Sequence, residues 1–173
     1  DDPQKNHFGF VRAAAGVHQT LPDVHFLLAG TGIDAGNVPL RQAIESAGLQ
    51  ERFHLLGRRE DIPRLMASLD VLASSSSGEA FPNVLGEAMA SSVPCAVTDV
   101  GDSAEIVGDT GRVVRPGDMA ALAHQIVELL RLPAVQRLAL GVRARERVRA
   151  NYEIGDVARR YEDFYTRLLR EGA

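Results

Sequence analysis

Short runs of β-branched or apolar residues alternate with amphipathic helical stretches along most of this chain. A chain in which each strand feeds a loop and then a helix folds as a parallel sheet covered by helices on both faces. With 173 residues, of which 45% are hydrophobic, it can bury a core as one compact unit without disulfides or metals. We therefore predict an α/β fold. The predicted strands are residues 24–29, 52–56, 70–73, 95–98 and 112–114, and the predicted helices are residues 6–19, 39–47, 62–68, 84–91, 103–107, 119–130, 134–150 and 154–169.

The charge of the chain argues against one class of partner. A formal net charge of -4 and a pI near 5.7 do not suit a nucleic-acid binder, whose contact surface is normally basic. The segment from Arg131 onward differs, because it carries ten arginines and six acidic residues. A basic tail of this kind either contacts acidic lipid headgroups or forms a solvated helix face. Peripheral contact of the full-length protein with a membrane therefore stays open as an alternative.

The sequence constrains the cellular location only loosely. Cys95 is the only cysteine, which excludes an intrachain disulfide and suits a reducing cytosol. No apolar run approaches the roughly 18 residues that a membrane-spanning helix needs, and no secretory signal pattern is present. We predict a cytoplasmic location, with the inner face of the membrane as the alternative.

A helix start near residue 83 predicts an anion site. Pro82 holds the backbone extended, and Asn83 is a preferred N-cap residue, so the helix is expected to begin at Val84. The first amides of that helix, at Val84, Leu85 and Gly86, then have no intrahelical partners. Together with the positive end of the helix dipole, such amides bind anions and suit phosphate best.

Two glutamates flank this predicted anion site. Glu79 precedes it in a serine-rich loop that begins at Ser74, and Glu87 follows it in the first turn of the helix. Serine runs are common in flexible linkers, but a strand and a helix directly flank this one. We therefore predict an ordered strand-to-helix loop at the carboxyl edge of the sheet, where open α/β folds bind ligands.

Five segments carry a resemblance to a known family. The segments are Pro3-Gln4-Lys5-Asn6-His7, Ala29-Gly30-Thr31-Gly32, Leu56-Gly57, Gly78-Glu79-Ala80-Phe81-Pro82-Asn83-Val84-Leu85-Gly86-Glu87-Ala88-Met89-Ala90 and Pro116-Gly117-Asp118. The long segment resembles the two-glutamate motif of the retaining glycosyltransferases of family 4, in which seven residues separate the acids. The resemblance covers nearly the whole chain. It implies a Rossmann-like parallel sheet with helices on both faces, which is one half of an enzyme with the two-domain GT-B architecture.

The resemblance also implies parts that this sequence does not contain. In the family, a strand and an arginine lie a few residues before the lysine of the first segment, and an acceptor-binding N-terminal domain precedes them. We expect residues 1–150 to form the nucleotide-sugar-binding domain, without its first strand. Residues 151–173 are expected to form a C-terminal helix that packs back toward the missing domain.

Three charged side chains take roles from this resemblance. Glu87 is expected to accept from the two hydroxyls of the nucleotide ribose, and Glu79 to contact the donor sugar near the reacting carbon. Lys5 is expected to contact the donor diphosphate and to stabilise its leaving charge. Each residue also has a purely structural interpretation. In that interpretation, the helix dipole favours the Glu87 carboxylate in the first turn, Glu79 is a solubilising acid, and Lys5 anchors a helix start.

Backbone groups of the motif are expected to hold the rest of the donor. Phe81, Pro82 and Asn83 would present amides and a carbonyl to the sugar hydroxyls, although the Phe81 ring could instead pack in the core. Val84 and Leu85 would donate their amides to the diphosphate, as the helix start already predicts.

Two glycine turns complete the predicted donor site. Gly30 and Gly32 follow a strand, but Ala35 stands where a dinucleotide fingerprint needs its third glycine, so we discount a nicotinamide cofactor. These glycines let the backbone approach the diphosphate, or they form an ordinary tight turn. Arg58 and Arg59 follow another strand end, where either one flanks the nucleotide base or faces solvent.

Other kinds of chemistry have little support in the sequence. The five histidines show no paired ligand spacing, and no Asp-x-Asp stands at a strand end to hold a metal beside a diphosphate. No Gly-x-Ser-x-Gly turn supports a hydrolase. We predict no cofactor and no metal, with a nucleoside diphosphate sugar as the substrate.

The predicted function is that of the donor-binding domain of a retaining glycosyltransferase, which transfers a hexose-like sugar to an unknown acceptor. The isolated chain is expected to bind the donor but scarcely to catalyse. One alternative is a non-catalytic module that binds a nucleotide or phosphate. Another is a nucleotide-sugar epimerase of similar architecture, which would convert the donor without an acceptor.

Overall fold

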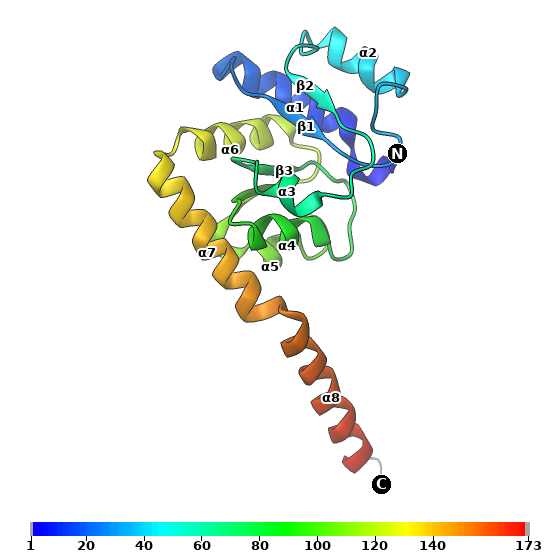
Figure 1. Ribbon diagram of the computed structural model, residues 1–173, viewed down its shortest axis with the longest axis vertical. Helices are drawn as coiled ribbons and strands as arrows, with labels where there is room; N and C mark the ends of the chain where they lie inside the picture. Colours follow the sequence, from blue (N-terminus) through cyan, green and yellow to red (C-terminus); the bar gives the residue numbers. More distant parts are fainter. Residues whose placement is uncertain (1, 172–173) are drawn as a thin grey trace.

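Helices and parallel strands alternate over residues 7–131 of the computed structural model, as predicted, and two more helices follow (Figure 1). The structure describes residues 2–171, so residue 1 and residues 172–173 of the predicted domain bounds lie outside the described residues. Every predicted element is present, with ends within two residues of the prediction. The strands are β1 (Phe26–Leu28), β2 (Phe53–Leu55), β3 (Leu72–Ser74), β4 (Cys95–Thr98) and β5 (Arg112–Val114). The helices are α1 (His7–Thr20), α2 (Val38–Ser46), α3 (Ile62–Met66), α4 (Asn83–Ala90), α5 (Ser103–Val107), α6 (Met119–Arg131), α7 (Ala134–Tyr152) and α8 (Ile154–Glu171), with short 3-10 turns η1 (Pro3–Lys5) and η2 (Gly108–Thr110).

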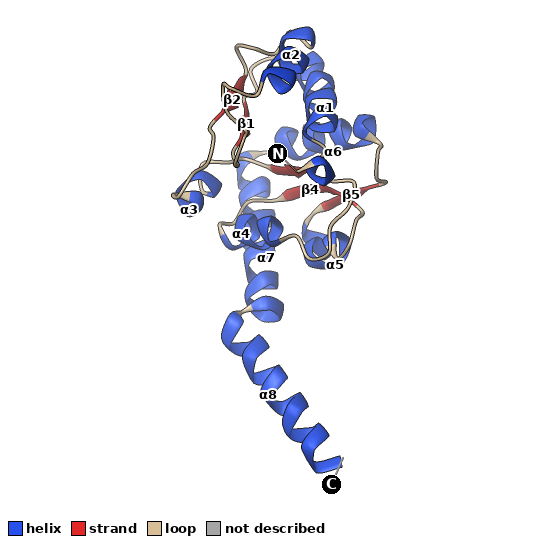
Figure 2. Ribbon diagram, turned by 90° about the vertical axis from the view of Figure 1, so that its right-hand side faces the viewer, coloured by secondary structure: helices blue, strands red, loops and turns tan. Residues whose placement is uncertain are grey.

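The described strands form two parallel sheets, which the sequence did not predict. β1 pairs with β2, with Phe26 opposite Phe53, while β4 lies between β3 and β5. Figure 2 shows the two-stranded sheet set apart from the strands β4 and β5. The carboxyl ends of both sheets lead into the loops that contain the predicted site residues.

Two apolar clusters lie on opposite faces of the three-stranded sheet. One cluster joins Ala96 and Val114 to α1, α6 and the rings of Phe26 and Phe53. The other joins the alternate strand residue Val97 to α3, α4, α5 and α7. All four residues of β4 are buried, as expected for a central parallel strand covered on both faces.

Side-chain caps fix the starts of α1, α2 and α6. The Asn6 side chain accepts from the Gly9 amide at the start of α1, and the Asn37 side chain accepts from the Leu40 amide at the start of α2. Asp118 caps α6 in the same way. Asp61 occupies the predicted N-cap position of α3 without making a cap hydrogen bond.

The last helix, α8, projects away from the body of the molecule (Figure 1). It carries large exposed apolar side chains along its length. Within residues 2–171, no helix is both long enough and apolar enough to cross a membrane. The exposed apolar side chains of α8 are Ile154, Tyr161, Phe164, Tyr165, Leu168 and Leu169.

Candidate functional site

The serine-rich loop between β3 and α4 is ordered and partly buried, as predicted. Ser75 is only 5% exposed, and its Oγ lies 3.1 Å from the Lys5 carbonyl oxygen and 3.0 Å from that of Asn6. In return, Asn6 Nδ2 donates to the Ser75 carbonyl oxygen at 3.1 Å. The Ser77 amide donates to the Gln4 carbonyl oxygen at 2.8 Å. These bonds attach the N-terminal turn η1 to the loop and so fix the position of Lys5.

Lys5 and Glu79, which the resemblance placed in one site, are in direct contact. Lys5 Nζ lies 2.6 Å from Glu79 Oε1, in an ion pair whose side chains are 42% and 11% exposed. Ser76 Oγ donates to the same carboxylate oxygen at 2.8 Å. A short, charge-assisted hydrogen bond to a carboxylate that is mostly covered fixes the orientation of the Lys5 and Glu79 side chains.

A second loop supports the backbone of Glu79. Asp102, in the turn after β4, donates its amide to the Ala80 carbonyl oxygen at 3.0 Å. In the same turn, Gly101 has a positive φ of 52°. A Cβ at Gly101 would overlap the carbonyl oxygens of Glu79 and Ala80 and would lie 2.8 Å from the Glu79 carbonyl carbon. Only glycine allows this close approach without displacing the loop.

The start of α4 corrects the predicted cap. The helix begins at Asn83, and its N-cap is Pro82, with φ -76° and ψ 94°. The Pro82 carbonyl oxygen accepts from the Leu85 amide at 3.1 Å, so the prediction of a free Leu85 amide is wrong. The extended backbone of proline already supplies the first acceptor, which moves the helix start one residue earlier. The Val84 amide stays in the first turn, where helix amides bind anions.

Glu87 lines a groove that Glu79 does not line. It is exposed on α4, and it lines a groove of about 390 Å³ with Phe81 and Asn83 of the same motif. The Phe81 ring is 46% exposed and packs edge-on against Tyr152 of α7, with 5.6 Å between the ring centroids. The Phe81 ring therefore does not pack in the core. Neither Glu79 nor Lys5 lines this groove.

The glycine turns after β1 and β2 are hydrogen-bonded to each other. The Gly30 amide donates to the Gly57 carbonyl oxygen at 2.9 Å, and the Gly57 amide donates to the Ile33 carbonyl oxygen at 2.7 Å. Gly32 has a positive φ of 75°, which suits a tight turn. Arg58 follows Gly57 and is exposed. The structure thus brings Gly30, Gly32 and Arg58 to the carboxyl edge of the two-stranded sheet.

Arg59 is bound to a neighbouring acid. Its Nε and Nη2 atoms donate to the two carboxylate oxygens of Asp61, each at 2.8 Å. This bidentate pair raises the pKa of Arg59 and lowers the pKa of Asp61, chiefly through the side-chain hydrogen bonds. It also explains why the Asp61 side chain does not cap α3. Of the two arginines predicted near the base, Arg58 is therefore the better candidate.

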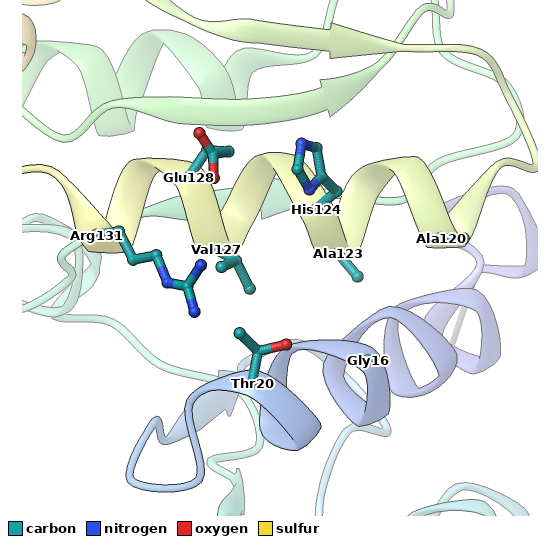
Figure 3. Close-up of a pocket in the computed structure, with 8 residues that line it drawn as sticks. All are labelled: Gly16, Thr20, Ala120, Ala123, His124, Val127, Glu128 and Arg131. Carbon is teal, nitrogen blue, oxygen red and sulfur yellow. The ribbon is translucent and has the colours of Figure 1, made fainter.

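The described residues contain no group of three or more histidine, cysteine or acidic side chains that could hold a metal ion. A metal-free reaction remains a prediction. A separate cavity of about 330 Å³ lies between α1 and α6, where Thr20 faces Val127 and Arg131 (Figure 3). None of the predicted site residues lines that cavity.

Sequence reasoning missed two residues that support Glu79, namely Ser76 and Gly101. Ser76 lies in the serine run, which suggested only a loop, and its position three residues before Glu79 was the available signal. Gly101 follows β4 at the carboxyl edge of the sheet, but it lies more than twenty positions from Glu79 in the chain, so no local pattern links the two residues.

Comparisons with known proteins identify the family. The family model of glycosyl transferases group 1 matches residues 1–132, and the chain belongs to this family. The chain is 33% identical over 154 residues to N-acetyl-alpha-D-glucosaminyl L-malate synthase of Bacillus anthracis, covering 88% of this chain and 40% of that protein. It is 32% identical over 173 residues to phosphatidyl-myo-inositol mannosyltransferase of Mycobacterium leprae, covering 96% of this chain and 45% of that protein.

Solved structures agree with this family. The crystal structure of Anabaena HepE in complex with UDP and glucose superimposes with a TM-score of 0.85 and 27% identity, over 97% of this chain and 46% of that one. The C-terminal domain of the group 1 family protein LpcC from Francisella tularensis superimposes with a TM-score of 0.77 and 25% identity, over 89% of this chain and 83% of that domain. The chain therefore has the fold of a GT-B C-terminal domain and spans less than half the length of these two full-length relatives.

Proposed function

We propose that this chain is the donor-binding domain of a retaining glycosyltransferase, which transfers a sugar from a nucleoside diphosphate sugar to an acceptor. The observation that carries the proposal is the 2.6 Å contact between Lys5 and Glu79, which lies in the loop that leads into α4. A cation, a carboxylate and helix-start amides at the carboxyl edge of a parallel sheet suit a sugar diphosphate. Complexes of the similar Anabaena HepE with UDP-glucose support this ligand class.

Lys5 and Glu79 divide the work at the reacting end of the donor. The lysine ammonium has three N–H donors, and one of them points to Glu79, which leaves two for phosphate oxygens. Negative charge grows on the diphosphate as the sugar leaves, so a fixed cation binds the transition state better than the substrate. In the proposal, Glu79 accepts from a hydroxyl of the sugar and the Val84 amide from α4 donates to the diphosphate.

The nucleoside end of the donor is assigned to other residues. Glu87 is exposed and has two acceptor oxygens for the ribose hydroxyls. The turns at Gly30 and Gly32 bring backbone close to the diphosphate, and Arg58 flanks the base. Phe81, Pro82 and Asn83 contribute backbone groups to the sugar hydroxyls.

Retention of configuration forms part of the proposal. We assign Glu79 a positioning role, with the acceptor attacking from the face that the diphosphate leaves. A covalent sugar adduct on Glu79, detected by mass spectrometry of the full-length enzyme under turnover, would contradict this assignment. So would unchanged turnover after Glu79→Ala.

The full-length enzyme would supply the remaining parts of the catalytic centre. We propose that an N-terminal domain binds the acceptor and that α8, within residues 151–173, packs back onto it. The exposed apolar side chains of α8 support this role. Residues 1–150 alone would then bind the donor without efficient turnover. The proposed location is the cytoplasm or the inner face of the membrane.

Calorimetry of the isolated chain tests the donor site. UDP-glucose, GDP-mannose and ADP-glucose are titrated with and without magnesium, and one of them is expected to bind saturably without the metal. Glu87→Ala should abolish most of that binding, whereas Glu128→Ala, a matched exposed glutamate on α6, should not change it. Equal binding of inorganic phosphate and the nucleotide sugars would instead support a general anion-binding module. Stabilisation that requires magnesium would contradict the metal-free assignment.

Product analysis separates a transferase from an epimerase. The full-length enzyme should leave the donor sugar unchanged when no acceptor is present, apart from slow hydrolysis. Conversion of the donor into its epimer under those conditions would support the epimerase instead.

A further inference from the structure

We propose that Ser76 and Gly101 are positioning residues, which hold Glu79 so that its second oxygen, Oε2, accepts from a hydroxyl of the donor sugar. This inference rests on the proposed function, because it assigns how the Glu79 carboxylate is presented to the donor. Two independent sets of contacts carry it. Ser76 acts on the Glu79 side chain, and Gly101 acts on the Glu79 backbone.

Ser76 is a buried and well-held hydrogen-bond donor. It is only 2% exposed, and its carbonyl oxygen accepts from Thr98 Oγ1 of β4 at 2.7 Å. An ionised carboxylate can only accept, so the single hydroxyl hydrogen of Ser76 must point to Glu79 Oε1, 2.8 Å away. A lone pair of Ser76 Oγ is then directed to Ser74 Oγ, at 3.4 Å. Ser76 must therefore be the donor in this hydrogen bond, and the bond from Thr98 of β4 holds its backbone in place.

Within the described part of the chain, the side-chain donors that reach the Glu79 carboxylate converge on one oxygen. Lys5 Nζ and Ser76 Oγ both meet Oε1, at 2.6 and 2.8 Å. Two donors on one oxygen fix the plane of the carboxylate, and the other oxygen keeps its accepting capacity for a ligand. Lys5 alone supplies a single donor to Oε1, which does not define the plane of the carboxylate, and Ser76 supplies the second donor.

Gly101 fixes the other end of the same residue. The turn after β4 packs so closely on the Glu79–Ala80 peptide that any Cβ at Gly101 would collide with backbone atoms. Backbone cannot rotate away as a flexible side chain can, so a larger residue must displace the Glu79 segment. The hydrogen bond from the Asp102 amide to the Ala80 carbonyl oxygen, 3.0 Å long, holds the turn after β4 against this peptide.

Paired variants of the isolated chain test the inference. Ser76→Ala removes the hydroxyl, and its control is Ser103→Ala. Ser103 is buried, and its Oγ has no hydrogen-bond partner among residues 2–171. Gly101→Ala displaces the Glu79 backbone, and its control is Gly48→Ala. Gly48 also has positive φ, at 69°, but has no atom within 4 Å of an added Cβ. The control thus carries the same backbone strain without the collision.

The measurement is the difference in affinity between a nucleotide sugar and its nucleotide. UDP-glucose and UDP, or GDP-mannose and GDP, are titrated calorimetrically, using the pair that the wild type binds. Ser76→Ala and Gly101→Ala should weaken binding of the sugar nucleotide about tenfold and change binding of the nucleotide by less than about twofold. Both controls should leave both affinities unchanged.

The outcomes are distinguishable. A wild type that binds the sugar nucleotide more tightly than the nucleotide, combined with an unchanged ratio in Ser76→Ala, overturns the inference and leaves the proposed function intact. A wild type that binds neither compound overturns the proposed function. Thermal unfolding of each variant identifies misfolding, and if Gly101→Ala does not fold, the comparison of Ser76→Ala with Ser103→Ala decides.

Discussion

The two sheets of this protein differ in how they are buried, although both are parallel. Every residue of β4 is buried, because apolar clusters cover both faces of the three-stranded sheet. In the two-stranded sheet, only the first residue of each strand is buried: Phe26 and Phe53 pack into one apolar cluster. The residues that follow them in the strands, such as Leu27 and His54, are half-buried or exposed. The alternation of Phe and His in β2 fits burial of one face only.

The difference separates two parts of the proposed donor site. Glu79, Ser76 and the start of α4 extend from the sheet that is covered on both faces. Gly30, Gly32 and Arg58 extend from the sheet that has one buried face. Sites need rigid support where charge develops in the reaction. The difference therefore suggests that the reacting end of the donor is held rigidly and the nucleoside end more loosely.

Thiol labelling should show the largest difference between the sheets. Burial raises the pKa of the Cys95 thiol in β4 to about 12, so almost no thiolate exists at pH 8. We expect iodoacetamide to label Cys95 at least about a thousandfold more slowly than in the urea-unfolded chain, since labelling requires opening of the core. A cysteine at the exposed position 54, made by His54→Cys in a Cys95→Ala background, should react at nearly the unfolded rate. Equal protection at both positions would remove the distinction between the sheets.

Truncation of one leucine in or beside each sheet should give the next largest difference. Leu85 on α4 is fully buried beneath the three-stranded sheet, and Leu85→Ala should lower the free energy of unfolding by about 2–5 kcal/mol. Leu27 in β1 is only half-buried and belongs to neither apolar cluster, so Leu27→Ala should cost about 1 kcal/mol. Urea denaturation measures both values. A cost for Leu27→Ala as large as that for Leu85→Ala would show that the two-stranded sheet is equally well packed.

Loss of single cations should show the same contrast in donor affinity. Lys5→Ala removes a charge held against Glu79 and should weaken nucleotide-sugar binding about ten- to hundredfold. Arg58 is exposed on the looser sheet, and Arg58→Ala should weaken it by less than about fivefold. Calorimetry with the same donor decides. A larger effect at Arg58 would place the stronger contact with the donor on the two-stranded sheet.

The smallest expected effect is a dependence of stability on pH through His7. Burial at the start of α1 lowers the pKa of His7, so the folded state favours the neutral imidazole. The unfolded chain therefore binds a proton more readily, and stability should fall as the pH drops below the ordinary histidine pKa of about 6.5. The urea midpoint of the wild type should decline between pH 7.5 and 5.5, and that of His7→Gln should decline less. Parallel curves for the two proteins would exclude His7 as the cause.

Local sequence patterns predicted most of the fold. The apolar run at Cys95–Thr98 and the helix turn at Ser103–Val107 have the predicted ends, because each pattern is fixed by neighbouring residues. The division into two sheets was not predicted, since strand pairing depends on contacts between distant segments. The start of α4 was missed by one residue because Pro82 can serve as the N-cap without a side-chain hydrogen bond.

The site was predicted in its residue types more than in its geometry. The family resemblance placed Glu79 and Lys5 in one site, and the structure joins them. It did not indicate that Glu87 lines a groove bounded by α4, α5 and α7 or that Gly101 supports the Glu79 backbone. Both facts depend on how loops from different strands pack, which no local pattern encodes.

The hydrogen bonds between the N-terminal turn and the serine loop also constrain the order of folding. Lys5 and Glu79 stand 74 positions apart, and the first three strands and three helices lie between them. Closing so long a loop is costly until the intervening units have formed. We therefore expect the ion pair to form late during refolding, so that the ability to bind a donor appears with the final kinetic phase. A chain that ended before Glu79 would contain Lys5 and the first three strands and helices, but it would lack the carboxylate that completes the proposed donor site.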